Sequence, residues 1–121
     1  MKLTLSIAAS VLLLSTAVYV ETPAEANIPN EGVCVVEFNA SFNSSNSVEW
    51  LDELSDCKGR RVDIASSPDM QKRHKIVVVP TVIVFSDGDE VERFQANIMM
   101  QLEATQDEVQ EAVDEILMSA F

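Results

Sequence analysis

The sequence predicts an α/β domain built on a mixed four-stranded sheet, with helices on both faces of the sheet. Expected elements follow one another in the order β-α-β-α-β-β-α, and the first βαβ unit requires parallel strands joined by a right-handed crossover. Further along, the dipeptide Asp87-Gly88 joins two β-rich runs, which requires an antiparallel hairpin. Only a mixed sheet satisfies both requirements, and the alternating helices must then cover both of its faces.

The N-terminal segment is expected to lie outside this domain. Residues 1–26 begin with one lysine, continue as an apolar run and end in the small-x-small pattern Ala24-Glu25-Ala26, which signal peptidases accept. We therefore predict a signal peptide over residues 1–26, a domain over residues 27–121, and a periplasmic or secreted location. An uncleaved membrane anchor is the alternative, because residues 3–20 are close to the minimum length that spans a bilayer.

The first half of the domain should hold two strands and two helices. Residues 32–38, GVCVVEF, are mostly apolar and β-branched, which is typical of a strand buried on both faces. Residues 46–56 predict a short amphipathic helix, since apolar residues recur three apart between acids. A second strand is expected at 60–65. Residues 67–75 start with a Ser-Pro cap and end in KRHK, which is typical of a solvated helix end.

The second half should hold a hairpin and a terminal helix. Residues 81–95 contain two β-rich runs around the Asp-Gly turn. Residues 105–121 begin with Thr105-x-x-Glu108, the pattern of a capping box, and continue with apolar residues on one helical face.

Three stretches resemble the thioredoxin family. VVEFNASF is similar to the family strand V-x-F-x-A-x-W, which leads into the W-C-G-P-C corner. VDIASSPDMQKRHKIVVVPTVIVFSDGDEVERF is similar to VDxxxxPxLxxxYxIxxxPTxxxFxxGxxVxxF, and the terminal helix fits the last family element. The resemblance covers residues 32–121. It implies a thioredoxin-like fold with Pro80-Thr81 at the position of the family's cis-proline.

The sequence departs from the family at its reactive corner. The alignment places Phe42 at the tryptophan and Asn43 and Asn46 at the two cysteines, with Ser44-Ser45 between them. Disulfide exchange needs a thiolate that attacks a sulfur and a second thiol that resolves the mixed disulfide, and amides supply neither. We therefore expect no dithiol catalysis at this corner and no cofactor.

The resemblance implies a binding function at the same place. The resemblance implies that the backbone before Pro80 faces outward and pairs with an extended peptide. Residues 96–105 include methionines, which adapt to varied partners. Two alternatives stay open: the proline only shapes its loop, and residues 96–105 fold onto the core as a helical turn. The expected surface for a peptide or protein partner comprises Phe42, Asn43, Asn46, Val79, Pro80, Ile98 and Met99.

Glu37 is an acid inside an otherwise apolar strand. The resemblance implies that family members carry an acid at this position, where it assists proton transfer at the cysteines. Because the cysteines are replaced, we expect Glu37 to serve as a structural hydrogen-bonding group.

Cys34 and Cys57 leave three alternatives open: a structural disulfide, two inert thiols, or a noncanonical thiol-disulfide oxidoreductase. Cys34 and Glu37 have opposite parity in one strand, so their side chains should point to opposite faces of the sheet. A redox site would need an accessible thiol of low pKa. Two distant cysteines and one histidine form no recognisable metal site.

The charge balance narrows the classes of partner. The chain has 20 acidic and 8 basic residues, and its formal net charge is −12. Nucleic acids and anionic membranes should repel such a domain. A structural subunit that assembles through its acidic helices is a third hypothesis for function.

Overall fold

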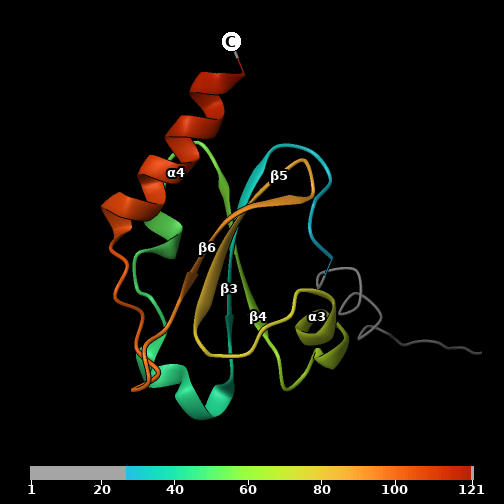
Figure 1. Cartoon of the computed structure of the whole chain (residues 1–121), viewed down its shortest axis with the longest axis vertical. Helices are drawn as coiled ribbons and strands as arrows, with labels where there is room; N and C mark the ends of the chain where they lie inside the picture. The colour runs from blue at the N-terminus through green and yellow to red at the C-terminus, as the bar shows by residue number, and fades with distance from the viewer. Residues whose placement is uncertain (1–26, 121) are drawn as a thin grey trace, which may run out of the picture.

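The computed structural model describes residues 27–120, so the predicted signal peptide lies outside the described residues. Strand β3 (Val33–Asn39) is central and pairs in parallel with β4 (Lys58–Asp63). On its other side β3 pairs antiparallel with β5 (Thr81–Ser86), which pairs antiparallel with β6 (Asp89–Gln95). The order β4-β3-β5-β6 confirms the predicted mixed four-stranded sheet (Figure 1).

Helices cover both faces of the sheet, as predicted. Helix α3 (Pro68–Arg73) lies on one side and buries Met70 in the cluster that holds Val36 and Phe38 of β3. Helix α4 (Gln106–Ser119) lies on the other side and buries Val109 in the cluster that holds Val35. Figure 1 shows the two helices on opposite sides of the strands. Successive residues of β3 thus feed two separate cores, which is why its sequence is apolar almost throughout.

The predicted capping box of the terminal helix is confirmed. The Thr105 Oγ1 accepts a hydrogen bond from the Glu108 N–H at 3.2 Å, and the Glu108 Oε1 accepts one from the Thr105 N–H at 2.8 Å. These two bonds satisfy donors that the first turn of a helix leaves unpaired.

The predicted helix at 46–56 is wrong. This part of the chain contains two short 3₁₀ helices instead, η2 (Ser41–Asn46) and η3 (Leu51–Glu53). Serine and asparagine side chains compete for backbone groups and disfavour a continuous helix. A spacing of three between apolar residues also matches the 3₁₀ period, so the pattern indicated burial correctly and the helix type incorrectly.

Strand β4 begins two residues before the predicted start, at Lys58. Its glycine explains how the strand passes η3, because a Cβ on Gly59 would lie 3.2 Å from the Leu51 carbonyl oxygen. Within residues 27–120, none of the helices has both the length and the apolar character that a bilayer crossing requires.

Candidate functional site

Three segments meet at one end of the sheet: η2, the loop before β5, and the loop between β6 and α4. Figure 1 shows η2 below the end of β3, with the loop after β6 beside it. This is the end at which the sequence resemblance places the family's reactive corner.

The side chain of Asn43 joins these segments. It is 4% exposed, and its amide nitrogen lies 3.1 Å from the Asn39 Oδ1, 3.2 Å from the Met100 carbonyl and 3.4 Å from the Val79 carbonyl. An amide carries two hydrogens, so the three acceptors share them. Asn43, which the sequence resemblance places at a family cysteine, therefore links the corner to both neighbouring loops.

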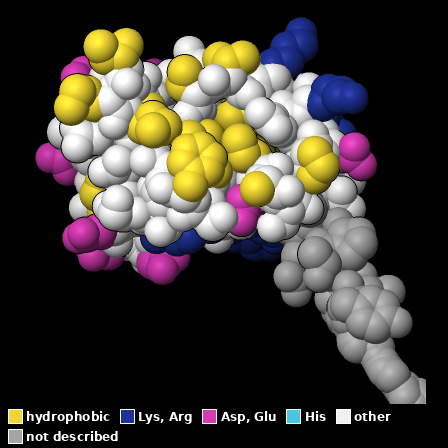
Figure 2. Space-filling view, turned by 90° about the horizontal axis from the view of Figure 1, so that it is seen from below, with side chains coloured by type: hydrophobic (Ala, Val, Ile, Leu, Met, Phe, Trp, Pro, Cys, Tyr) yellow, Lys and Arg dark blue, Asp and Glu magenta, His cyan; other side chains and the backbone are white. Residues whose placement is uncertain are grey.

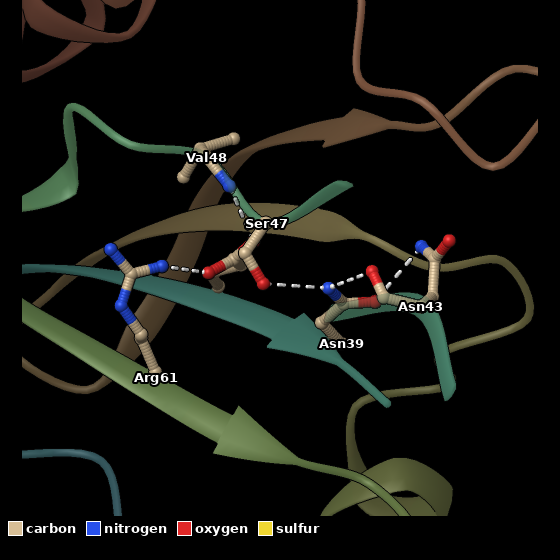
Figure 3. A network of polar contacts seen from close by, with 6 residues as sticks. Asn39, Asn43, Ser47, Val48 and Arg61 are labelled. Atoms are coloured by element: carbon tan, nitrogen blue, oxygen red, sulfur yellow. Dashed lines mark hydrogen bonds and ion pairs between the residues drawn. The ribbon is translucent and has the colours of Figure 1, made fainter. Parts of the chain in front are cut away.

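Further amides complete a polar network around Asn43 (Figure 3). The Asn46 Nδ2 donates to the Asn43 Oδ1 at 2.8 Å. The Asn39 Nδ2 donates to the Asn43 carbonyl at 3.1 Å and to the Ser47 Oγ at 3.0 Å. Buried amides of this kind are favourable only when their donors and acceptors are paired, and here they pair with one another.

Glu37 lies beneath this corner and is 1% exposed. Its Oε2 accepts a hydrogen bond from the Val48 N–H at 2.9 Å, and its Oε1 pairs with the Arg61 guanidinium. These contacts fasten the chain after η2 to β3 and to β4. They are the kind of contacts that a structural acid makes, and no local pattern of the sequence indicates Arg61 as the partner of Glu37.

Several large apolar side chains are exposed at this end of the molecule. Their exposed fractions are 100% for Ile98, 80% for Val77, 76% for Phe42, 66% for Met99 and 41% for Met100. Figure 2, viewed toward this end, shows hydrophobic side chains gathered over it, with both acidic and basic side chains around them. These five residues are called the apolar surface below.

The loop that presents Ile98 and Met99 is an ordered turn. The Asn97 Oδ1 accepts hydrogen bonds from the Met99 N–H at 2.8 Å and the Gln101 N–H at 3.1 Å. The Asn97 N–H donates to the Gln101 carbonyl at 2.9 Å. Ile98 and Met99 therefore do not fold onto the core, which was the alternative left open by the sequence.

Three residues of the predicted partner surface have buried side chains. Asn43, Val79 and Pro80 are buried, so their side chains are not offered to a partner. The Val79–Pro80 peptide bond is cis. The Val79 carbonyl accepts the Asn43 amide, whereas its N–H makes no hydrogen bond within residues 27–120. Val77 and Met100 lie in the stretches VVVPT and ANIMM, which the sequence also indicates as part of this surface, and both are exposed.

The two cysteines are free thiols. Cys34 is buried in the core under α3, whereas Cys57 packs against the core under α4, so they belong to opposite faces of the sheet. Burial raises the pKa of the Cys34 thiol. Burial, followed by the charge of Cys34, raises the pKa of the Cys57 thiol. A raised pKa lowers the thiolate fraction, which disfavours thiol chemistry.

This environment predicts slow alkylation of both thiols. At about pH 8, iodoacetamide should modify Cys34, which is 1% exposed, at least about tenfold more slowly than glutathione in the same buffer. Intact mass would follow both additions, with the unfolded protein as the control for full reactivity. Either thiol reacting faster than glutathione would contradict the expectation and favour the oxidoreductase hypothesis.

Comparison with solved structures relates this architecture to known proteins. A mutant thioredoxin from Halobacterium salinarum superposes with a TM-score of 0.59 at 20% identity, covering 78% of this chain and 82% of that one. Schistosoma mansoni thioredoxin gives a TM-score of 0.56 at 19% identity, covering 71% of this chain and 78% of that one. A designed protein gives 0.56 at 22% identity, covering 78% and 87%.

No protein-family model matches the sequence, and no curated protein matches it. The likeness therefore concerns the fold, and it agrees with the observed strand order and with helices on both faces of the sheet. The chain has a thioredoxin-like fold.

Proposed function

We propose that this protein is an exported, redox-inactive thioredoxin-like domain that binds an extended peptide, or an extended segment of a partner protein, over the apolar surface. One observation carries the proposal: exposed apolar side chains surround a corner whose amide network fastens the loops that present them. Export rests on the sequence pattern of residues 1–26.

The exposure of the apolar surface supports a binding role. Soluble monomers rarely leave contiguous apolar patches in water, because burying such area is favourable. Ile98 and Met99 stand out from a turn that Asn97 holds in place. A partner would therefore meet side chains whose backbone is already ordered, which lowers the entropic cost of association.

The backbone at Val79 provides a way to align an extended peptide. Its N–H makes no hydrogen bond within the described chain and can donate to a peptide carbonyl. The Val79 carbonyl accepts a hydrogen bond from the Asn43 amide through one lone pair, and its second lone pair can accept another from a peptide N–H. Main-chain pairing at this residue would fix the peptide's direction, while Phe42 and Met99 would contact its side chains.

The corner supports redox inactivity for a chemical reason. Asn43 and Asn46 replace the two thiols that exchange requires, and both amides are already engaged in hydrogen bonds. Cys34 and Cys57 have raised pKa values, so neither thiol is primed to replace them.

The proposal predicts that Met99→Asp weakens binding of a peptide selected from a random display library. A charge within the apolar surface should lower affinity at least about tenfold, because it must be desolvated against an apolar partner. Fluorescence anisotropy with the labelled peptide would measure the dissociation constant.

Met118→Asp is the matched control. Met118 is a methionine of similar exposure, at 74%, but it lies near the end of α4, at the opposite end of the molecule from η2 (Figure 1). The Met118→Asp variant should bind the peptide with the affinity of the unmodified protein. Equal affinity of the Met99 and Met118 variants would overturn the proposal, as would a selection that enriches no peptide.

A further inference from the structure

A second concave region lies on the α3 side of the sheet and shares no residue with the apolar surface. It is a cavity of about 640 Å³. Its walls come from the start of the described chain, from β4, from the end of α3 and from the hairpin turn between β5 and β6. The lining residues are Asn27, Ile28, Pro29, Asn30, Arg60, Arg73, His74 and Gly88.

The charge of this lining is opposite to that of the protein. Among the residues that the structure describes, two arginines and a histidine line the cavity, and no aspartate or glutamate does. The chain as a whole carries 20 acidic and 8 basic residues. A basic concavity in an acidic protein attracts anions locally, because nearby cations dominate the potential inside a recess.

His74 is the most unusual residue of the lining. Its ring packs between Phe38 and Phe85, with centroid separations of 5.5 Å and 5.3 Å. Among the described residues, its Nε2 is the one buried side-chain nitrogen or oxygen atom without a hydrogen-bond partner. Leaving a buried polar atom unpaired costs about 1–3 kcal/mol, so such an atom calls for an explanation.

The backbone around His74 is held in place, and so is the opposite wall. Arg93 donates to the His74 carbonyl at 2.6 Å and to the Lys75 carbonyl at 3.1 Å. Across the cavity, Asp87 links the hairpin turn to the segment that follows Asn30. The Asp87 N–H donates to the Gly32 carbonyl at 2.9 Å, and the Asp87 Oδ1 accepts a hydrogen bond from the Gly32 N–H at 2.7 Å. These bonds fix the backbone on two sides of the cavity.

We propose that this cavity binds a small oxyanion, a carboxylate or a phosphate group. Arg73 supplies a planar guanidinium that can donate two parallel hydrogen bonds to such a group. The His74 Nε2 supplies the hydrogen bond that it lacks in the free protein. Arg60 also lines the cavity, and one of its nitrogens donates to the Asn27 carbonyl. This site is independent of the peptide-binding proposal.

The site should bind its anion more tightly as pH falls. The charged groups that face His74 are Arg73 on α3 and Glu90 and Arg93 on β6, and Glu90 is already paired with Arg93. Burial, followed by the charge of Arg73, lowers the pKa of His74, so its ring is neutral at neutral pH. A bound oxyanion favours the imidazolium and raises that pKa, so protonation and binding reinforce each other.

The test is an NMR titration of the purified full chain, monitored at the His74 imidazole. Succinate and inorganic phosphate are the two probes, each at about pH 6 and about pH 8, and succinamide is the uncharged control. Saturable shifts with either anion are expected, with a lower dissociation constant at the lower pH. Saturable shifts with succinate but not phosphate would assign a carboxylate ligand, and saturable shifts with phosphate but not succinate would assign a phosphate ligand.

Two variants make the assignment specific. Arg73→Gln removes an exposed charge, and His74→Phe keeps an aromatic ring between Phe38 and Phe85. Each should raise the dissociation constant at least about tenfold, whereas Lys72→Gln, on the same helix but outside the lining, should not. Circular dichroism would check folding, and Arg73→Gln tests the proposal even if the His74 variant unfolds. Absence of saturable shifts, an equal response to succinamide, or an equal loss in Lys72→Gln would overturn it.

Discussion

Replacing Asn43 by alanine is expected to lower the free energy of unfolding by about 2–4 kcal/mol. The change removes the amide that reaches Asn39, Val79 and Met100. Alanine is too short to replace it, and these acceptors lie in a part of the corner that is largely closed to water. Each buried acceptor left without a donor costs about 1–3 kcal/mol, and partial relaxation of the loops would recover some of the loss.

Urea unfolding of the Asn43→Ala protein would measure this effect. Ser44→Ala is the matched control, because Ser44 is exposed, lies in the same η2 turn and should change stability by less than about 0.5 kcal/mol. Amide hydrogen exchange should also become faster at Met100, whose loop would lose its link to η2. Equal stability of the two variants would show that Asn43 does not hold the three segments together.

Glu37→Ala is expected to cost about 2–4 kcal/mol of unfolding free energy. The substitution leaves the buried Val48 N–H without its acceptor and opens a cavity in a fully buried position. The partner guanidinium adds less to the cost, because the Arg61 side chain is 43% exposed and can turn to water. The main loss therefore comes from the N–H and the missing volume.

A conservative variant separates these causes. Glu37→Gln keeps an oxygen acceptor for the Val48 N–H and nearly the same volume, so it should cost about 1 kcal/mol, from the weakened contact to Arg61. Thermal and urea unfolding of both variants would measure the difference, with Glu49→Ala as an exposed acid from the same segment. A Glu37→Ala protein as stable as Glu49→Ala would contradict a structural role for this acid.

The sheet was predictable from the sequence because its signals are local. The Asp87-Gly88 turn determines an antiparallel hairpin, and a strand–helical crossover–strand order predicts a parallel pair next to it, although the crossover holds 3₁₀ helices and no α-helix. The capping box at Thr105 uses residues three apart, so its spacing alone reveals it. The prediction of an α-helix at 46–56 was wrong because a spacing of three between apolar residues suits more than one helix type. The hydrogen bond from the Val48 N–H to Glu37 joins two different segments, so this spacing could not reveal it.

The site was only partly predictable, since its central contacts join distant segments. Phe42, Ile98 and Met99 were expected at the surface and are exposed. The bonds from Asn43 span 36 and 57 positions, to Val79 and Met100 respectively, and spacing carries no sign of them. KRHK was typical of a solvated helix end, yet the His74 Nε2 is buried, because the ring packs between two phenylalanines from β3 and β5.

The most direct test of the peptide-binding account is NMR mapping of a display-selected peptide on the isotopically labelled protein. The account predicts saturable shifts of the backbone amides of Phe42 and Met99, together with slower hydrogen exchange of the Val79 N–H when the peptide pairs with it. Shifts that map instead to the exposed face of α4, or an unchanged exchange rate at Val79 under saturating peptide, would contradict it.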